Sequence, residues 1–204
     1  MPISLNGTTG AVTGIVSASS TDLSTALVPR TGATGTINLS TATLTGAGMD
    51  LITTQSFSAV SSVSINNCFT SSYENYCILV KALPSATSGI QFRYRASGVD
   101  AATSYTYAYV ANDSGTSSVV TGTANQAEID FISTSSVRRF LINCFEPNVA
   151  AVTVSLTQFH NYSGRSGFVA NRHDIGSAVH DGITIFPSSG TITGNIRVYG
   201  YRNS

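Results

Sequence analysis

The chain is poor in charge. Ten basic and ten acidic side chains are spread over 204 residues, so the formal net charge is zero. A protein that holds phosphate backbones carries clustered lysine and arginine, and this composition therefore argues against a nucleic-acid partner. A neutral surface has little self-repulsion. Such a chain is suited to a large assembly that partly covers its surface, and an ordinary soluble monomer is the alternative.

Long apolar runs are missing as well. No stretch of about 18 apolar residues occurs, and a helix that spans a bilayer needs about 20, so we expect no membrane partner. The start of the chain, Met1–Gly7, lacks the basic and apolar regions of a signal peptide. The chain is therefore expected to be made in a cytoplasm without export.

Cysteine is scarce, with only Cys68, Cys77 and Cys144 in the chain. An odd number of cysteines in apolar surroundings predicts buried thiols that act as small hydrophobes. A Cys68–Cys77 bridge across a hairpin is the alternative, and it requires an oxidising environment.

Histidine is equally scarce, and two of the three histidines stand in similar pairs, His173-Asp174 and His180-Asp181. Histidine and carboxylate side chains bind metals such as zinc. No helix face or close hairpin that the sequence predicts brings the two pairs together. We therefore interpret them as polar loop residues and expect no metal site.

Other catalytic patterns are also absent. Gly164-Arg165-Ser166-Gly167 lacks the Gly-x-Ser-x-Gly elbow and its strand-to-helix setting. Glu128 and Asp130 share one face of a strand, and we expect both to be solvated rather than paired across a cleft. The sequence predicts no catalytic residue and no cofactor, and hence a protein that is not an enzyme.

The sequence is rich in hydrophobic residues, at 42%, and in the residues of strands and turns. Apolar side chains recur with a period of two, and about ten short strands are expected with no helix between them. Such a pattern predicts an all-β fold, an antiparallel β-sandwich of jelly-roll type. The expected strands are Phe57–Ile65, Tyr76–Ala82, Ile90–Ala96, Tyr105–Tyr109, Ala127–Phe131, Val137–Phe145, Ala151–Phe159, Gly167–Ile175, Ile183–Phe186 and Ile192–Tyr199.

Two stretches carry a resemblance to a known family. The first is the strand entry Tyr73-Glu74-Asn75-Tyr76, and the second is Ile183–Gly200, which reads as a closing hairpin around Ser188-Ser189-Gly190. Together they resemble a β-sandwich (jelly-roll) module of virion structural proteins in tailed bacteriophages, of the capsid-decoration or tail-fibre type. The resemblance covers roughly residues 57–204, and we expect the first stretch to pair with the second.

Residues 1–50 differ from the sandwich domain expected at 51–204. They contain no aromatic residue and three charges, Asp22, Arg30 and Asp50, so they cannot build a core alone. The resemblance implies that this extended N-terminal arm attaches the protein to the particle or intertwines a trimer. A floppy leader is the alternative. The apolar residues expected at a partner interface are Leu23, Leu27, Val28, Ile37 and Leu39.

The resemblance implies a virion protein made in the cytoplasm of the bacterial host. The leading expectation is a homotrimeric capsid decoration, or cement, protein whose arm contacts the major capsid protein. The alternative is a short tail fibre that joins other tail proteins and recognises a host surface glycan. For that role Tyr105, Tyr107 and Tyr109 could stack on sugar rings, although packing in the core is favoured. A free glycan-processing enzyme is the third alternative.

Overall fold

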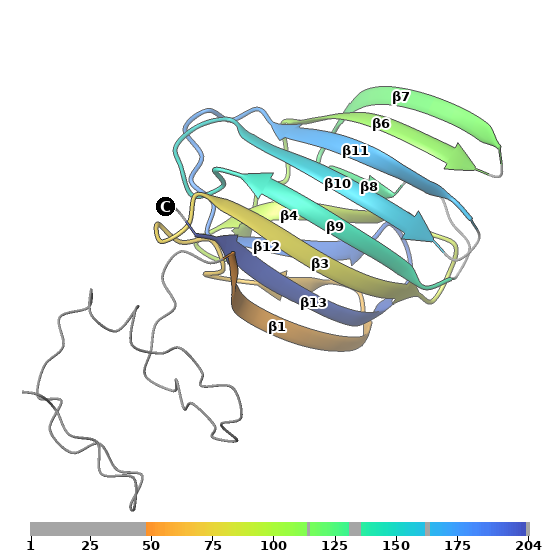
Figure 1. Cartoon of the computed structure of the whole chain (residues 1–204), viewed down its shortest axis with the longest axis horizontal. Coiled ribbons are helices and arrows are strands. Elements are labelled where there is room, and N and C mark those ends of the chain that lie inside the picture. Colours follow the sequence, from red (N-terminus) through yellow and green to blue (C-terminus); the bar gives the residue numbers. More distant parts are fainter. Residues whose placement is uncertain (1–47, 114, 131–135, 162–163, 203–204) are drawn as a thin grey trace, which may run out of the picture. The chain divides into compact units, whose positions relative to one another are not determined.

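A computed structural model of the chain describes residues 48–113, 115–130, 136–161 and 164–202. Every regular element in these residues is a strand, and the strands form two antiparallel sheets that pack together as a β-sandwich (Figure 1). This arrangement confirms the predicted all-β class. No helix in the described part of the chain is long and apolar enough to cross a bilayer.

The large sheet contains eight strands in the order β1-β13-β3-β9-β10-β11-β6-β7. Its middle is the meander β9-β10-β11, and β1 and β7 are its two edges. The bounds are β1 Met49–Val60, β3 Asn75–Pro84, β6 Tyr105–Asp113, β7 Thr116–Ala124, β9 Arg138–Phe145, β10 Thr153–Asn161, β11 Ser166–His173 and β13 Ile192–Tyr201.

The small sheet contains five strands, β2 Val63–Ile65, β4 Ile90–Ala96, β5 Val99–Asp100, β8 Ala127–Asp130 and β12 Gly182–Pro187. They are ordered β2-β12-β4, and β5 and β8 both pair with β4. Figure 1 shows β4, β8 and β12 behind the large sheet. The large sheet therefore has more strands than the small sheet can cover.

The chain crosses between the sheets several times, at β1–β2, β2–β3, β3–β4, β5–β6, β7–β8, β8–β9, β11–β12 and β12–β13. The last of these crossings corrects one expectation. The segments around Ser188–Gly190 do not form a hairpin, because β12 lies in the small sheet and β13 lies in the large one. The predicted pairing of the closing strand with the strand at Tyr76–Ala82 is confirmed, since Val198 lies opposite Ile78 in the β13–β3 ladder.

The sequence located some strands well and merged others. The expected strand Ile90–Ala96 has the bounds of β4, and its residues Ile90, Phe92 and Tyr94 are all buried. The stretch Phe57–Ile65 was wrong as one strand, because the chain leaves β1 at Val60 and enters the small sheet at Val63. Ala59, beside this change of sheet, has a φ of 52°. The edge strand β7 was missed, because Thr116–Ala124 has no apolar alternation.

The core lies between the sheets and is mostly aliphatic and aromatic. Fully buried side chains include Ile78, Phe92 and Ile142 from both sheets. β1 starts at Met49, and its Asp50 accepts hydrogen bonds from Arg202 and Tyr73 (2.7 and 2.9 Å). The arm residues Leu23, Leu27, Val28, Ile37 and Leu39 lie outside the described residues.

Candidate functional site

Over residues 153–157 the strand β10 places its polar residues inside the sandwich and its apolar residues outside, whereas further along the strand Phe159 is buried and Gln158 is exposed. Thr153, Ser155 and Thr157 are fully buried, whereas Val154 is 40% exposed and Leu156 is partly exposed. In an ordinary sandwich strand the apolar side chains face the core and the polar ones face solvent, since apolar side chains gain most from burial. The outward apolar residues identify the outer face of the large sheet, the side away from the small sheet, as a candidate contact surface.

An apolar band crosses this outer face from β3 to β7. The ladders place Leu79 beside Leu141, Phe168 beside Val110, and Val110 beside Val119, with Gln158 between Leu141 and Phe168. Phe168 and Val119 are 52% and 72% exposed. Because single exposed apolar residues are normal but contiguous ones mark binding sites, the band is the strongest candidate for a functional surface in the described residues.

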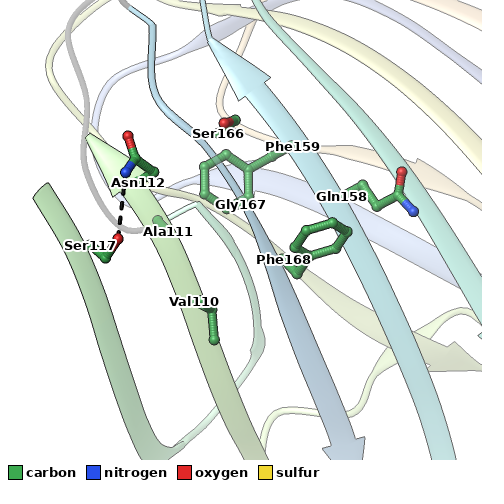
Figure 2. A pocket seen from close by; sticks show the side chains of 9 residues that line it. All are labelled: Val110, Ala111, Asn112, Ser117, Gln158, Phe159, Ser166, Gly167 and Phe168. Carbon is green, nitrogen blue, oxygen red and sulfur yellow. Dashed lines mark hydrogen bonds between the residues drawn. The ribbon is translucent and has the colours of Figure 1, made fainter. Parts of the chain in front are cut away.

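Two open hollows lie along this band. The first has a volume of about 370 Å³ and is drawn in Figure 2, where Phe168 and Gln158 lie side by side and Val110 stands on the neighbouring strand. At its far end Asn112 donates a hydrogen bond to Ser117 (3.4 Å). The second hollow, of about 320 Å³, lies over Leu79 and Leu141 and shares Gln158 with the first. The outer face therefore has two hollows that side chains of a partner can fill.

The charges on this face are basic. Lys81 pairs in register with Arg139, and Arg139 with His160, so a basic row runs beside the apolar band. Arg197 lies next to Leu79 within the band. Among the described residues, Lys81, Arg139 and Arg197 form no ion pair. The face thus combines apolar surface with unneutralised positive charge.

The three tyrosines of β6 do not form an exposed platform. Tyr105 and Tyr109 are each 1% exposed and belong to the core, so neither ring offers a face to a sugar. Tyr105 donates to the carbonyl of Ala101 and accepts from the backbone of Tyr94, both at 3.0 Å. Tyr107 is partly exposed and lies over Gly122 of β7, where a Cβ would overlap its ring. The core packing that we favoured is confirmed for Tyr105 and Tyr109.

Our interpretation of His173 and His180 as polar loop residues is wrong, because His173 ends β11 and His180, in the loop before β12, is buried beside it. Each is 1% exposed, and His180 Nε2 lies 3.2 Å from His173 Nδ1. The His180 ring stacks on Tyr94 of the small sheet, with centroids 4.8 Å apart, and His173 lies 4.5 Å from the Tyr105 ring. Periodicity in the sequence could not reveal this pair, because the contact depends on how the loop before β12 folds back over the core.

Burial sets the protonation of these histidines. It lowers the pKa of His180 to about 4, assisted by the neighbouring His173 and opposed by Asp181. Burial also lowers the pKa of His173. Both rings are therefore neutral at neutral pH. They have no access to solvent, and no group of three metal-ligand side chains occurs in the described part of the chain.

The acidic residues of β8 also differ from expectation. Glu128 and Asp130 are buried, at 5% and 0% exposure, rather than solvated. Glu128 accepts hydrogen bonds from Gln91 and Gln126, and burial raises the pKa of its carboxyl. Asp130 lies 3.4 Å from the fully buried Arg138. Since an isolated buried charge is costly, these partners inside the sandwich compensate for the burial of the two carboxylates.

The three cysteines are free and buried, which confirms the predicted thiols and excludes the Cys68–Cys77 bridge in this structure. Burial raises the pKa of Cys68 and of Cys144 to about 12. Such thiols stay protonated and inert at neutral pH.

Comparison of the chain with protein-family models, with curated proteins and with solved structures found no match.

Proposed function

We propose that this chain is a non-enzymatic structural protein of a tailed-bacteriophage virion, and that it decorates the capsid as a homotrimer. The observation that carries the proposal is the outer face of the large sheet, which is broad, apolar and basic on a chain of zero net charge. A surface of this kind supports adhesion to another macromolecule. The resemblance of Tyr73–Tyr76 and Ile183–Gly200 to the phage module supports the assignment to a phage virion.

The mechanism is burial of apolar surface across the joints of a shell. Removing apolar surface from water contributes about 25 cal/mol per Å², so a few hundred Å² per copy contributes several kcal/mol. In this proposal the arm residues act as the clamp and the sandwich projects from the shell. The clamp contains Leu23, Leu27, Val28, Ile37 and Leu39.

The tail-fibre alternative is less well supported. That alternative requires exposed aromatic rings that stack on a glycan, and both Tyr105 and Tyr109 are buried. The enzyme alternative is less well supported because Glu128, Asp130, His173 and His180 are all buried.

The test is the copy number per purified particle, measured by quantitative mass spectrometry against the major capsid protein. We expect hundreds of copies, as a shell decoration requires. A few to a few dozen copies would transfer the assignment to the tail fibre. Absence from the particle would refute the proposal in both forms.

A further inference from the structure

The edge strand β7 lacks the features that usually protect a sheet edge from pairing with another chain. An edge strand presents unpaired N–H and C=O groups, and proteins protect them with charges, proline, bulges or a very short strand. β7 has nine residues, Thr116–Ala124, with no charged residue and no proline among them. Its ladder with β6 runs to Tyr105 without a register shift. Figure 1 shows β7 at the upper margin of the large sheet.

The other edges in the described residues are protected. At the opposite margin of the large sheet, the ladder of β1 with β13 has two register shifts, between Leu51 and Thr53 and between Phe57 and Val60. Such bulges bend a strand and interrupt its row of hydrogen-bonding groups. In the small sheet, β2 has three residues, β5 has two and β8 has four. Of the edges that the structure describes, β7 alone is therefore both long and regular.

Alternate backbone groups of β7 point away from β6. Residues of an antiparallel strand bond in turn to the strand on one side and to the strand on the other. The carbonyl of Val110 in β6 faces β11, because a Cβ on Gly167 of β11 would overlap it. The preceding residue, Tyr109, therefore bonds to β7 through its partner Val120. The residues of β7 that instead turn their N–H and C=O groups to the open edge are Ser117, Val119, Thr121 and Thr123.

This set of open groups matches itself when a second copy of β7 lies antiparallel to the first. With a two-fold axis at Val120, perpendicular to the sheet, Val119 of each copy lies opposite Thr121 of the other. Ser117 likewise lies opposite Thr123, so all four residues exchange backbone hydrogen bonds, and Val120 lies opposite Val120 in a pair without hydrogen bonds. A shift of this register in either direction leaves open groups of the strand without a partner. The backbone therefore selects the axis at Val120.

The side chains that meet across this axis are suited to a sheet. None of them is charged, and β-branched residues, which pack well on neighbouring strands, lie at the centre. Val119 and Val120 are 72% and 44% exposed. Val119 belongs to the apolar band of the outer face, whereas Val120 lies beside Tyr109 on the side of the small sheet. The pairing would thus cover apolar side chains on both faces of the large sheet.

We propose that β7 is a pairing edge at which two copies of this chain join their large sheets, with the strands antiparallel and the two-fold axis at Val120. The occupant is β7 of the second copy because the other long edge, β1, is interrupted by its bulges. The inference concerns the sandwich alone and stands without the virion role. A two-fold contact cannot relate the three chains of one trimer. In the trimer, which rests on the proposed function, it would join neighbouring trimers.

The experiment is disulfide trapping on the full chain under mild oxidation with oxidised glutathione. In the proposed pair the two Val120 Cα atoms lie about 4.5 Å apart, within the roughly 4.4–6.8 Å that a disulfide spans. Val120→Cys should therefore link two copies, which a denaturing gel without reductant shows as a band of doubled mass. The native cysteines do not compete, because all three are buried.

The matched control is Val119→Cys, at the neighbouring and more exposed position. The two Val119 residues lie diagonally across the axis, about 7–8 Å apart, which is too far for an unstrained disulfide. Random collisions would link Val119→Cys more readily, and the proposed register links Val120→Cys. We expect Val120→Cys to link about tenfold faster than Val119→Cys, or more.

Sedimentation velocity over a concentration series is a second test, and it needs no cysteine. The natural chain should associate, and Val120→Lys should weaken the association about tenfold or more, because it sets two like charges directly opposite each other. Val99→Lys adds the same charge at an exposed position of β5 and should leave the association unchanged. Circular dichroism establishes that each variant is folded.

The proposal would be overturned if both cysteine variants linked equally, if Val119→Cys linked faster, or if no linked pair formed at any concentration. A different segment on β7 would leave Val120→Cys unlinked and would have the same consequence. Equal association of Val120→Lys and Val99→Lys would also overturn it. Since no particle enters these experiments, their failure is separate from a failure of the copy-number test.

Discussion

Lowering the pH should destabilise the sandwich through the buried histidines. His180 stacks on Tyr94 and contacts His173, and the nearest carboxylate that favours its protonation is that of Asp181. Folding lowers the pKa of His180 from its usual value of 6.5 to about 4. The unfolded chain therefore binds the proton first as the pH falls. Stability is full above about pH 6.5 and is lost progressively towards about pH 4.

The size of the effect follows from the shift. Between pH 7.5 and pH 5, His180 alone should remove about 2 kcal/mol from the free energy of unfolding. For a domain of this size that loss corresponds to a fall in Tm of about 4–8 °C. His173, whose pKa is also lowered, adds to the loss. Glu128 acts in the opposite direction, because burial raises the pKa of its carboxyl.

The assay is urea unfolding of the natural chain and of His180→Phe at both pH values. Phenylalanine keeps a flat ring against Tyr94 and does not titrate, so the difference between the two chains isolates His180 from Glu128. We expect the natural chain to lose about 2 kcal/mol more than the variant between pH 7.5 and pH 5. Equal pH dependence of the two chains would refute the assignment to His180.

Two further predictions concern the core. Gly194→Ala should destabilise the domain by about 2–3 kcal/mol in urea unfolding, because the new Cβ would overlap the Lys81 carbonyl between β13 and β3. Gly176→Ala should be nearly neutral, because its Cβ meets Val152 at an ordinary 3.9 Å. Equal effects of the two substitutions would contradict this packing. In the native chain a thiol reagent such as dithionitrobenzoate should label no cysteine within minutes at pH 8, and in urea it should label all three. Rapid labelling of the native chain would show that the thiols are accessible and would contradict their burial. The cysteines are Cys68, Cys77 and Cys144.

Sequence periodicity located most of the strands because it reports local geometry. Side chains alternate across a strand whatever the strand packs against. The alternation in Ile90–Ala96 therefore gave β4 its bounds, and Tyr76–Ala82 found the buried face of β3.

Periodicity does not tell which face of a strand is inside. In β10 the sequence shows two alternating sets, Thr and Ser in one and Val and Leu in the other, and alternation alone does not select the set that faces the core. The sheets bury Thr153, Ser155 and Thr157 and leave Val154 outside. The choice depends on what the neighbouring strands and the small sheet place opposite β10, and that information is spread over the whole chain.

The sequence by itself determined the fold class, the poverty in charge and the burial of the cysteines, because composition and local alternation decide them. Only the tertiary structure decided the rest. It divided β12 and β13 between two sheets, brought His180 onto Tyr94, and sealed Glu128 inside the sandwich. These outcomes are contacts between residues far apart in the chain, and their free energy depends on the packing of the whole sandwich rather than on any single stretch.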